Sequence, residues 1–316
     1  MKNSLKFSSI SILVLVLFFT SCKKDKVVDT SVEVDESASF SLQSVDVNTT
    51  NNCSDMSFED AENVLSQSSL SGAKTASFTG ICGATIDTTF IASDKKIIIT
   101  YNGNTCDGLS NRTGTVTIQL TNGNKWKDLG SVLIMTYAKF RVTNLSTNKY
   151  HTLNGEYELT NETGGIIAHI GISPNPTTII RTIKANSLAL TFDNGTVRTW
   201  SISRQKTWLG SSGKVTSLSI DGHEDLAGVT KTEVWGINRL GHTFTTVMNV
   251  PLVLNSTCGW FSPISGKKTH TFNNRVSTIT FGTDVSGNVI TNGCPNHFIV
   301  NWNSPKGNAK YYIGTY

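Results

Sequence analysis

The chain has little proline, little charge and no long apolar run. It contains 6 Pro, and only 16% of its 316 residues are charged. Its longest apolar stretch, from Ile10 to Phe19, is about half of the ~20 residues that a membrane-spanning helix requires, so we expect no retained span. Low charge together with abundant Gly, Ser, Thr and Asn favours strands and polar turns over helices.

Sequence signatures of common enzyme chemistry are also missing. The chain has no Gly-x-Ser-x-Gly, no His-Glu-x-x-His and no Cys-x-x-Cys, so neither a serine nucleophile nor a zinc site is indicated. No glycine-rich phosphate loop precedes a helix, which sets nucleotide chemistry aside. The six His are scattered singly, as is typical of surface and turn positions: His151, His169, His223, His242, His270 and His297.

The formal net charge of +4 is concentrated near the beginning of the chain. Lys2, Lys6 and the cluster Lys23, Lys24 and Lys26 supply five positive charges against one from Asp25. The remainder is close to neutral, so nothing in the charge balance favours nucleic acid as a partner.

What is present begins with an export signal. Lys2 and Lys6 precede the apolar run, and the small residues Thr20-Ser21 stand immediately before Cys22. This order is that of a secretory signal peptide over residues 1–21. Its ending resembles the lipobox of bacterial lipoproteins, in which the thiol is diacylated and becomes the first residue of the mature chain. The resemblance implies a membrane anchor at Cys22, and Lys23 after it resembles lipoproteins released to the outer membrane.

Two short segments follow the anchor. Residues 22–52 have few aromatic residues and no sustained periodicity, which predicts a flexible tether. Residues 53–72 form the next segment, where Ser57 and Asp60 have capping-box spacing and predict a helix over about 55–68. Its apolar residues at helical spacing are Phe58, Ala61 and Leu65.

Five further cysteines lie after Cys22, and export permits disulfides. The pairs Cys82/Cys106 and Cys258/Cys294 bracket comparable stretches of strand and turn, so we predict these two bonds. Cys53 remains, either buried and reduced or paired with another chain.

Beyond Gly72 the period changes from helical to two. Val116, Ile118 and Leu120 alternate with polar residues, which indicates a half-buried strand. A second set of apolar residues is expected on one side of a long strand: Val132, Ile134, Ala138, Phe140 and Val142. Turn residues recur at intervals of roughly ten. We therefore predict an all-β fold, an antiparallel sandwich or meander of many short strands over residues 73–316.

The two cysteine pairs suggest an internal repeat within this region. Each is followed or enclosed by strands and an Asn-Gly turn, which would fit two units at about 73–145 and 255–316. Residues 146–254 would then form a central meander.

Two local groups are candidates for binding. Asp221 to Asp225 contains three carboxylates and could ligate calcium, although a solvated turn is the simpler interpretation and we predict no metal and no cofactor. Trp200 and Trp208 share strand parity. On a solvent face they would stack on sugar rings, with Arg198 and Arg204 as hydrogen-bond donors, whereas their parity with Ile202 favours the core.

Several turn and strand-edge motifs accompany the second cysteine pair and the first. They are Pro251-Leu252, Asn238-Arg239-Leu240-Gly241, Ser265-Gly266-Lys267-Lys268, Asp107-Gly108 and Arg112-Thr113. In this set, residues 80–316 resemble uncharacterised β-rich envelope lipoproteins of the Bacteroidota. The resemblance implies an envelope location and a β-rich architecture, and it transfers no activity.

These features predict a lipid-anchored envelope protein with a non-enzymatic binding or structural role. The expected partners are the membrane, through the acyl anchor, and a glycan or protein ligand. The alternative is a hydrolase of an extracellular polymer whose carboxylates converge only in space.

Overall fold

The structure, a computed structural model, describes residues 82–106, 108–239, 241–260, 262–272, 275–303 and 309–315. The expected signal peptide, acylation site Cys22, tether, helix 55–68 and Cys53 lie outside these residues. No described helix has the length and apolar character needed to cross a membrane.

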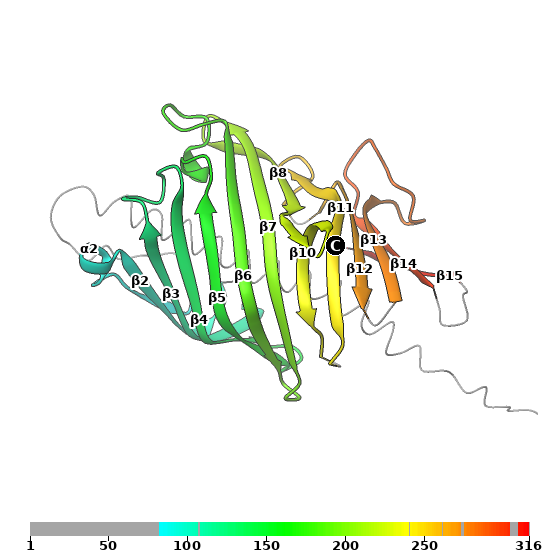
Figure 1. Ribbon diagram of the computed structural model, residues 1–316, viewed down its shortest axis with the longest axis horizontal. Helices are drawn as coiled ribbons and strands as arrows, with labels where there is room; N and C mark the ends of the chain where they lie inside the picture. Colours follow the sequence, from blue (N-terminus) through cyan, green and yellow to red (C-terminus); the bar gives the residue numbers. More distant parts are fainter. Residues whose placement is uncertain are drawn as a thin grey trace, which may run out of the picture. The chain divides into compact units, whose positions relative to one another are not determined.

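The described strands form one antiparallel sheet, which confirms the predicted all-β class with many strands. Figure 1 shows most of them side by side in chain order. The strands of the first half are β1 (Ala84–Asp87), β2 (Lys96–Asn104), β3 (Ser110–Asn122), β4 (Ser131–Asn144), β5 (Tyr150–Asn161), β6 (Thr178–Phe192) and β7 (Val197–Ser211). Those of the second half are β8 (Lys214–Gly222), β9 (Glu224–Leu226), β10 (Val229–Ile237), β11 (Thr243–Asn255), β12 (Ser265–Phe272), β13 (Arg275–Thr283), β14 (His297–Asn303) and β15 (Ala309–Thr315).

Helical structure within the described residues is limited to two short turns, α2 (Ile91–Asp94) and the 3-10 turn η1 (Ile167–His169). The hydrogen-bonded path runs from β1 to β15 without a break. The stretches suggested as two units and a central meander are therefore joined in one continuous sheet.

Alternation of apolar residues places one face of the sheet in the core. In β3, Val116, Ile118 and Leu120 are all buried, as the period of two predicted. Successive strand residues point to opposite faces, so the polar residues between them lie on the other face.

The predicted core side of β4 is wrong for most of its residues: only Phe140 is buried, Val142 is partly buried and Ala138 is exposed. Leu133, Met135 and Tyr137 are buried, whereas Val132 and Ile134 are only partly buried. A register shift between Tyr137 and Phe140, with Lys139 at φ +52°, returns Phe140 to the buried side. The buried face of β4 could not be predicted from the sequence, because both faces carry apolar residues and an inserted residue changes the alternation.

Between β7 and β11, two strands lie end to end. β8 pairs with Arg204–Ser211 of β7, and β10 pairs with Thr199–Ile202 of the same strand. At Gly222 the two strands lie so close together that a Cβ would collide with the backbone carbonyl of Lys231, so only glycine fits this position. On the β11 side, Pro251 lies between the residues paired with β10 and those paired with β8, where its missing N–H costs no ladder hydrogen bond.

Both predicted disulfides are present. Cys82–Cys106 closes a sequence separation of 24 residues at the β1–β2–β3 edge, and Cys258–Cys294 closes one of 36 residues. The second bond joins the loop between β11 and β12 to the loop between β13 and β14.

Candidate functional site

Strand β7 directs charged and aromatic side chains toward the interior. Every second residue from Arg198 to Trp208 is buried: Arg198, Trp200, Ile202, Arg204, Lys206 and Trp208. The expected parity with Ile202 is correct. The alternative of an exposed sugar-stacking platform is wrong, because Trp200 and Trp208 are only 3% and 8% exposed and Arg198 and Arg204 are buried with them.

The buried charges of neighbouring strands gather into a group that we call the charged band: Arg181, Arg204, Lys206, Glu233 and Lys268. Arg181 on β6 is the direct cross-strand neighbour of Lys206 on β7. Arg204 lies two residues before Lys206 on the same face. Like charges directly opposite each other across a sheet are destabilising.

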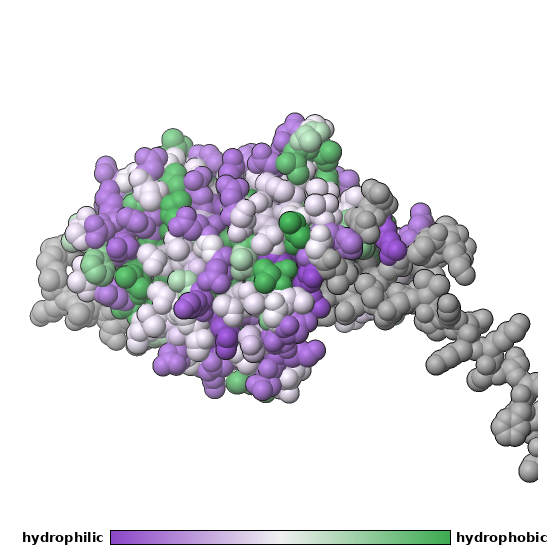
Figure 2. Space-filling view, turned by 60° about the horizontal axis from the view of Figure 1, so that its bottom comes forward, coloured by the Kyte–Doolittle hydropathy of each residue, from purple (hydrophilic) through white to green (hydrophobic). Residues whose placement is uncertain are grey.

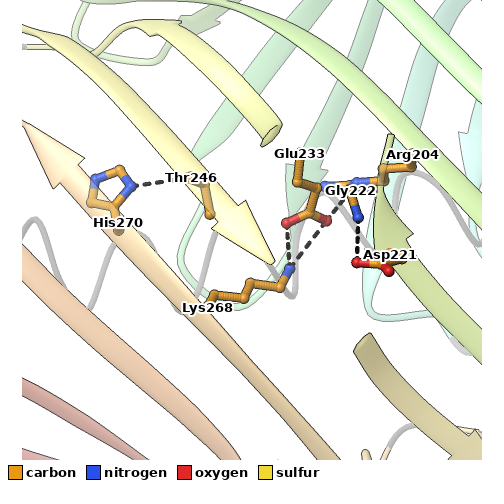
Figure 3. Close-up of polar contacts among 7 residues, drawn as sticks. All are labelled: Arg204, Asp221, Gly222, Glu233, Thr246, Lys268 and His270. Atoms are coloured by element: carbon orange, nitrogen blue, oxygen red, sulfur yellow. Dashed lines mark hydrogen bonds and ion pairs between the residues drawn. The ribbon is translucent and has the colours of Figure 1, made fainter. Parts of the chain in front are cut away.

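Glu233 supplies a carboxylate within the band. Its Oε1 lies 2.7 Å from Arg204 Nε, and its Oε2 lies 2.8 Å from Lys268 Nζ. Lys268 Nζ also donates a hydrogen bond of 3.1 Å to Oε1. Figure 3 shows the carboxylate between the two cationic side chains, which come from β7 and β12. All three side chains are buried.

Burial and charge act in opposite directions on Glu233. Desolvation raises the pKa of its carboxyl, but attraction by Arg204 and Lys268 outweighs this and holds the pKa below its usual value. Burial lowers the pKa of Lys268, and attraction by Glu233 opposes the effect only in part. Glu233 is therefore a counter-ion rather than a proton donor near neutral pH.

A bulge explains why Glu233 points inward. The pairing of β10 with β11 shifts register between Thr232 and Val234, so Thr232, Glu233 and Val234 are all buried in succession. From sequence, the polar run before Val234 gives no sign of an interior position. Lys268 had a clearer signal, since it alternates with Gly266, His270 and Phe272, all of which are buried.

Aromatic rings border one end of the band. The guanidinium of Arg181 lies 4.8 Å from the Trp126 ring centroid and 5.5 Å from that of Trp208. Lys206 Nζ lies 5.9 Å from the Trp208 centroid. Such contacts stabilise a desolvated cation by about 2 kcal/mol or more, whereas burying an ion costs several kcal/mol.

His270 lies beside the band on β12. Its Nδ1 is 3.0 Å from Thr246 Oγ1, a contact also drawn in Figure 3. Burial, reinforced by the charge of Arg198, lowers the pKa of His270 to about 3. The imidazole is therefore neutral at physiological pH and adds no positive charge to this face.

The acidic stretch considered for calcium is divided between two strands. Asp221 lies in β8 and pairs with Lys231 at 2.7 Å, whereas Glu224 and Asp225 lie in β9. The Asp221–Lys231 pair is partly exposed, with the two side chains 25% and 50% accessible. Within the described ranges, no cluster of His, Cys, Asp and Glu has the arrangement of a metal site.

A second region lies at the surface, where Cys258–Cys294 holds two loops together. We call residues 256–264 and 284–296 the linked loops; their bridging Cα atoms are 5.0 Å apart. Trp260 is 37% exposed, and it is the most exposed Trp in the described part of the chain. Val285 and Val289 are also exposed.

The linked loops are polar but almost uncharged, since Asp284 is their one ionisable residue other than the bonded cysteines. Its Oδ1 accepts hydrogen bonds of 2.8 Å from the backbone N–H groups of Ser286 and Asn288. The exposed hydroxyl and amide side chains are Ser256, Thr257, Ser286, Asn288, Thr291, Asn292 and Asn296. On the face drawn in Figure 2, hydrophobic residues form small groups among hydrophilic ones rather than one broad patch.

Comparison with known proteins gives no relative: no family model, no curated protein and no solved structure matches the chain. The fold and the two cysteine pairs define a disulfide-bonded all-β protein.

Proposed function

We propose that this is a lipid-anchored, non-enzymatic binding protein of the cell envelope, acylated at Cys22, whose ligand is a neutral glycan taken at the linked loops. The observation that carries the ligand class is the exposed Trp260 within an almost uncharged, cross-linked surface. This region takes the place of the sequence-based candidates Trp200 and Trp208.

The chemistry of the linked loops suits a sugar. An exposed indole offers an apolar face on which the C–H groups of a pyranose ring stack. Hydroxyl and amide side chains such as Asn292 and Thr291 donate and accept hydrogen bonds in the way that sugar hydroxyls require. The near absence of charge favours a neutral ligand over an acidic one.

The disulfide supports the same function through preorganisation. Loops that order only on binding lose conformational freedom, at about 0.5–1.5 kcal/mol for each immobilised flexible side chain. Cys258–Cys294 restricts the two loops before a ligand arrives. Asn255 Oδ1 further accepts a hydrogen bond of 2.8 Å from the Cys258 N–H, which fixes the entry to the first loop.

The charged band supports a non-enzymatic role. Glycoside hydrolysis uses two carboxyl groups about 5–10 Å apart, one of which carries a proton. Glu233 is the one buried carboxylate among the described residues, and its pKa is lowered by two cations. An acid with that environment remains ionised and is a poor proton donor.

The proposed anchor is the thiol of Cys22, and the proposed location is the outer membrane. Two or more acyl chains would make the attachment effectively permanent. We expect metabolic labelling with palmitate to tag the wild-type chain and not a Cys22→Ser variant, and fractionation to place the labelled chain in the outer membrane. Equal labelling of both chains would contradict the acylation site.

The ligand is tested on a glycan array with the full chain carrying Cys22→Ser, so that it stays in solution. Trp260→Ala removes the stacking surface, and Tyr311→Ala is a matched control because Tyr311 is an exposed aromatic residue on β15, outside the linked loops. Selective binding to neutral glycans that is lost only in Trp260→Ala supports the proposal. Binding that survives in Trp260→Ala, or no binding to any neutral glycan, overturns it.

A further inference from the structure

The last strand of the sheet has one unpaired edge. Strand β15 bonds to β14 on one side, and no described strand lies on its other side. Alternate residues of an antiparallel strand direct their N–H and C=O groups to opposite sides. About half of the main-chain groups of β15 therefore face outward, and an edge of this kind can accept a further strand.

The opposite edge of the sheet is poorly suited to pairing. Strand β1 has four residues and ends at the exposed Asp87, whose Oδ1 accepts a hydrogen bond of 2.8 Å from the Thr89 N–H. Short edge strands and charged residues are two of the devices that keep sheet edges from associating. β15 has seven residues and pairs with β14 without a register shift, so it offers the longer and more regular edge.

A series of aromatic rings ends at β15. The ring centroids of Phe281 and Phe298 are 6.2 Å apart, and those of Phe298 and Tyr312 are 6.3 Å apart. Both phenylalanines are buried, whereas Tyr312 is 46% exposed. Aromatic residues on neighbouring strands stabilise a sheet when they pair, so a further ring beside Tyr312 would continue the series.

We propose that β15 pairs with β15 of a second copy of this chain, antiparallel about a two-fold axis at Tyr312, and so joins two sheets into one. Two-fold dimers, in which both copies use the same surface, are the commonest homo-oligomers. The inference is independent of the proposed glycan ligand, because β15 is not part of the linked loops.

Full overlap of two seven-residue strands about a two-fold axis fixes the register. Tyr312 then lies opposite Tyr312 of the second copy, which continues the ring series from one copy into the other. Tyr311, which is 69% exposed, lies opposite Ile313, and pairs of aromatic and β-branched residues stabilise sheets. Lys310, the one charged residue in the sequence of β15, lies opposite Gly314 and does not oppose its own copy.

A second β15 fits this edge better than β1 of a second copy does. β1 provides four residues against the seven of β15, so part of the edge would remain unpaired. Pairing of β15 with β1 is also a head-to-tail contact, which produces open-ended assemblies unless the rotation closes a ring. The two-fold contact pairs β15 over its whole length and ends with the dimer.

The first test measures association of the full chain carrying Cys22→Ser/Cys53→Ser, which removes thiols that could link two copies covalently. A single strand pair is a small interface of the weak class. Analytical ultracentrifugation should therefore find a dimer at about 100 µM chain and a monomer at about 1 µM. A monomer at both concentrations, or a series of larger assemblies, would overturn the proposal.

Charges placed at the two-fold axis test the register. Tyr312→Lys and Tyr312→Glu each bring two like charges directly opposite each other, so each should weaken association at least about tenfold. Mixing the two variants brings opposite charges together and should restore the dimer. The matched control Tyr311→Lys also changes an exposed tyrosine of β15, but its new charge faces Ile313 and should weaken association by about threefold at most. Wild-type association of both Tyr312 variants, or a mixture that stays monomeric, would overturn the proposal.

If a Tyr312 variant fails to fold, hydrogen exchange of the unsubstituted strand decides the question. The outward amides of β15 should exchange at least about fivefold more slowly at 100 µM than at 1 µM chain, because pairing protects them. The amides of β1 are the internal control and should exchange equally at both concentrations. Equal exchange of β15 at the two concentrations would overturn the proposal.

Discussion

The charged band and the linked loops use similar residues in opposite surroundings. The band places Trp126 and Trp208 beside buried cations, whereas the linked loops expose Trp260 among uncharged polar groups. A buried charge is costly when its partner is lost, so the band is tied to the stability of the sheet. An exposed indole contributes little to the fold, so it is free to serve recognition.

Among the variants that test this comparison, removal of the Glu233 carboxylate should have the largest effect on stability. Glu233→Ala leaves Arg204 and Lys268 buried without their shared carboxylate, and we expect the free energy of unfolding to fall by about 3–5 kcal/mol. Urea denaturation measures it. The control Asp221→Asn breaks the exposed pair with Lys231 and should cost less than about 1 kcal/mol. Similar costs for both variants would refute the special role of burial.

Replacing Arg204, Glu233 and Lys268 together distinguishes the effect of charge on stability from the effect of packing. In Arg204→Met/Glu233→Leu/Lys268→Met no uncompensated charge remains, and buried ion groups exchanged for apolar residues are often neutral or stabilising. We therefore expect the triple variant to recover most of the stability lost in Glu233→Ala. A triple variant less stable than Glu233→Ala would show that the ion group itself, rather than charge balance, holds β7, β10 and β12 together.

Opening the Cys258–Cys294 bond should have the next largest effect. Closure of a 36-residue separation contributes about 4 kcal/mol in the chain-entropy model. Cys258→Ser/Cys294→Ser should lose that stability in urea denaturation and also lose glycan binding. Cys82→Ser/Cys106→Ser, with a separation of 24 residues, should lose about 3.5 kcal/mol and keep its binding. Loss of binding in both variants would contradict the assignment of the ligand to the linked loops.

Acid should destabilise the interior through His270. Its pKa is lowered to about 3 in the folded chain, against about 6.5 when unfolded. Between these values the unfolded state binds the proton and the folded state does not, so stability falls as the pH decreases from 6.5 toward 3.

The loss attributable to His270 is about 2 kcal/mol between pH 6.5 and 5. Urea denaturation across this range should show a shallower pH dependence for His270→Gln than for wild type. His223→Gln, at an exposed position, is the control and should retain the wild-type slope. Identical slopes for all three chains would show that His270 does not resist protonation.

Much of the fold was predictable from sequence because it depends on local pattern. The period of two placed Val116, Ile118 and Leu120 in the core, and the bracketing of strand and turn by cysteines predicted both disulfides. Parity with Ile202 correctly favoured the core for Trp200 and Trp208. These predictions depend on residues close together in the sequence, and they do not require knowing which strands pair.

What the sequence could not predict depends on inserted residues and on non-local pairing. A register shift near Lys139 reversed the core side of β4, and another beside Thr232 turned Glu233 inward. The charged band forms only because β10, rather than β8, lies beside Thr199–Ile202 of β7. Acylation at Cys22, the tether and the helix over 55–68 stay predictions.

Among these variants, Trp260→Ala should have the smallest effect on stability and the largest effect on glycan binding. Trp260→Ala removes an exposed side chain and should change the free energy of unfolding by less than about 0.5 kcal/mol. Trp208→Ala, at a buried position, should cost about 3–5 kcal/mol. Urea denaturation of both variants, with glycan binding measured for Trp260→Ala, tests the division of roles. A large loss of stability in Trp260→Ala would mean that the indole supports the linked loops from within, and its loss of binding would then say nothing about direct contact with a sugar.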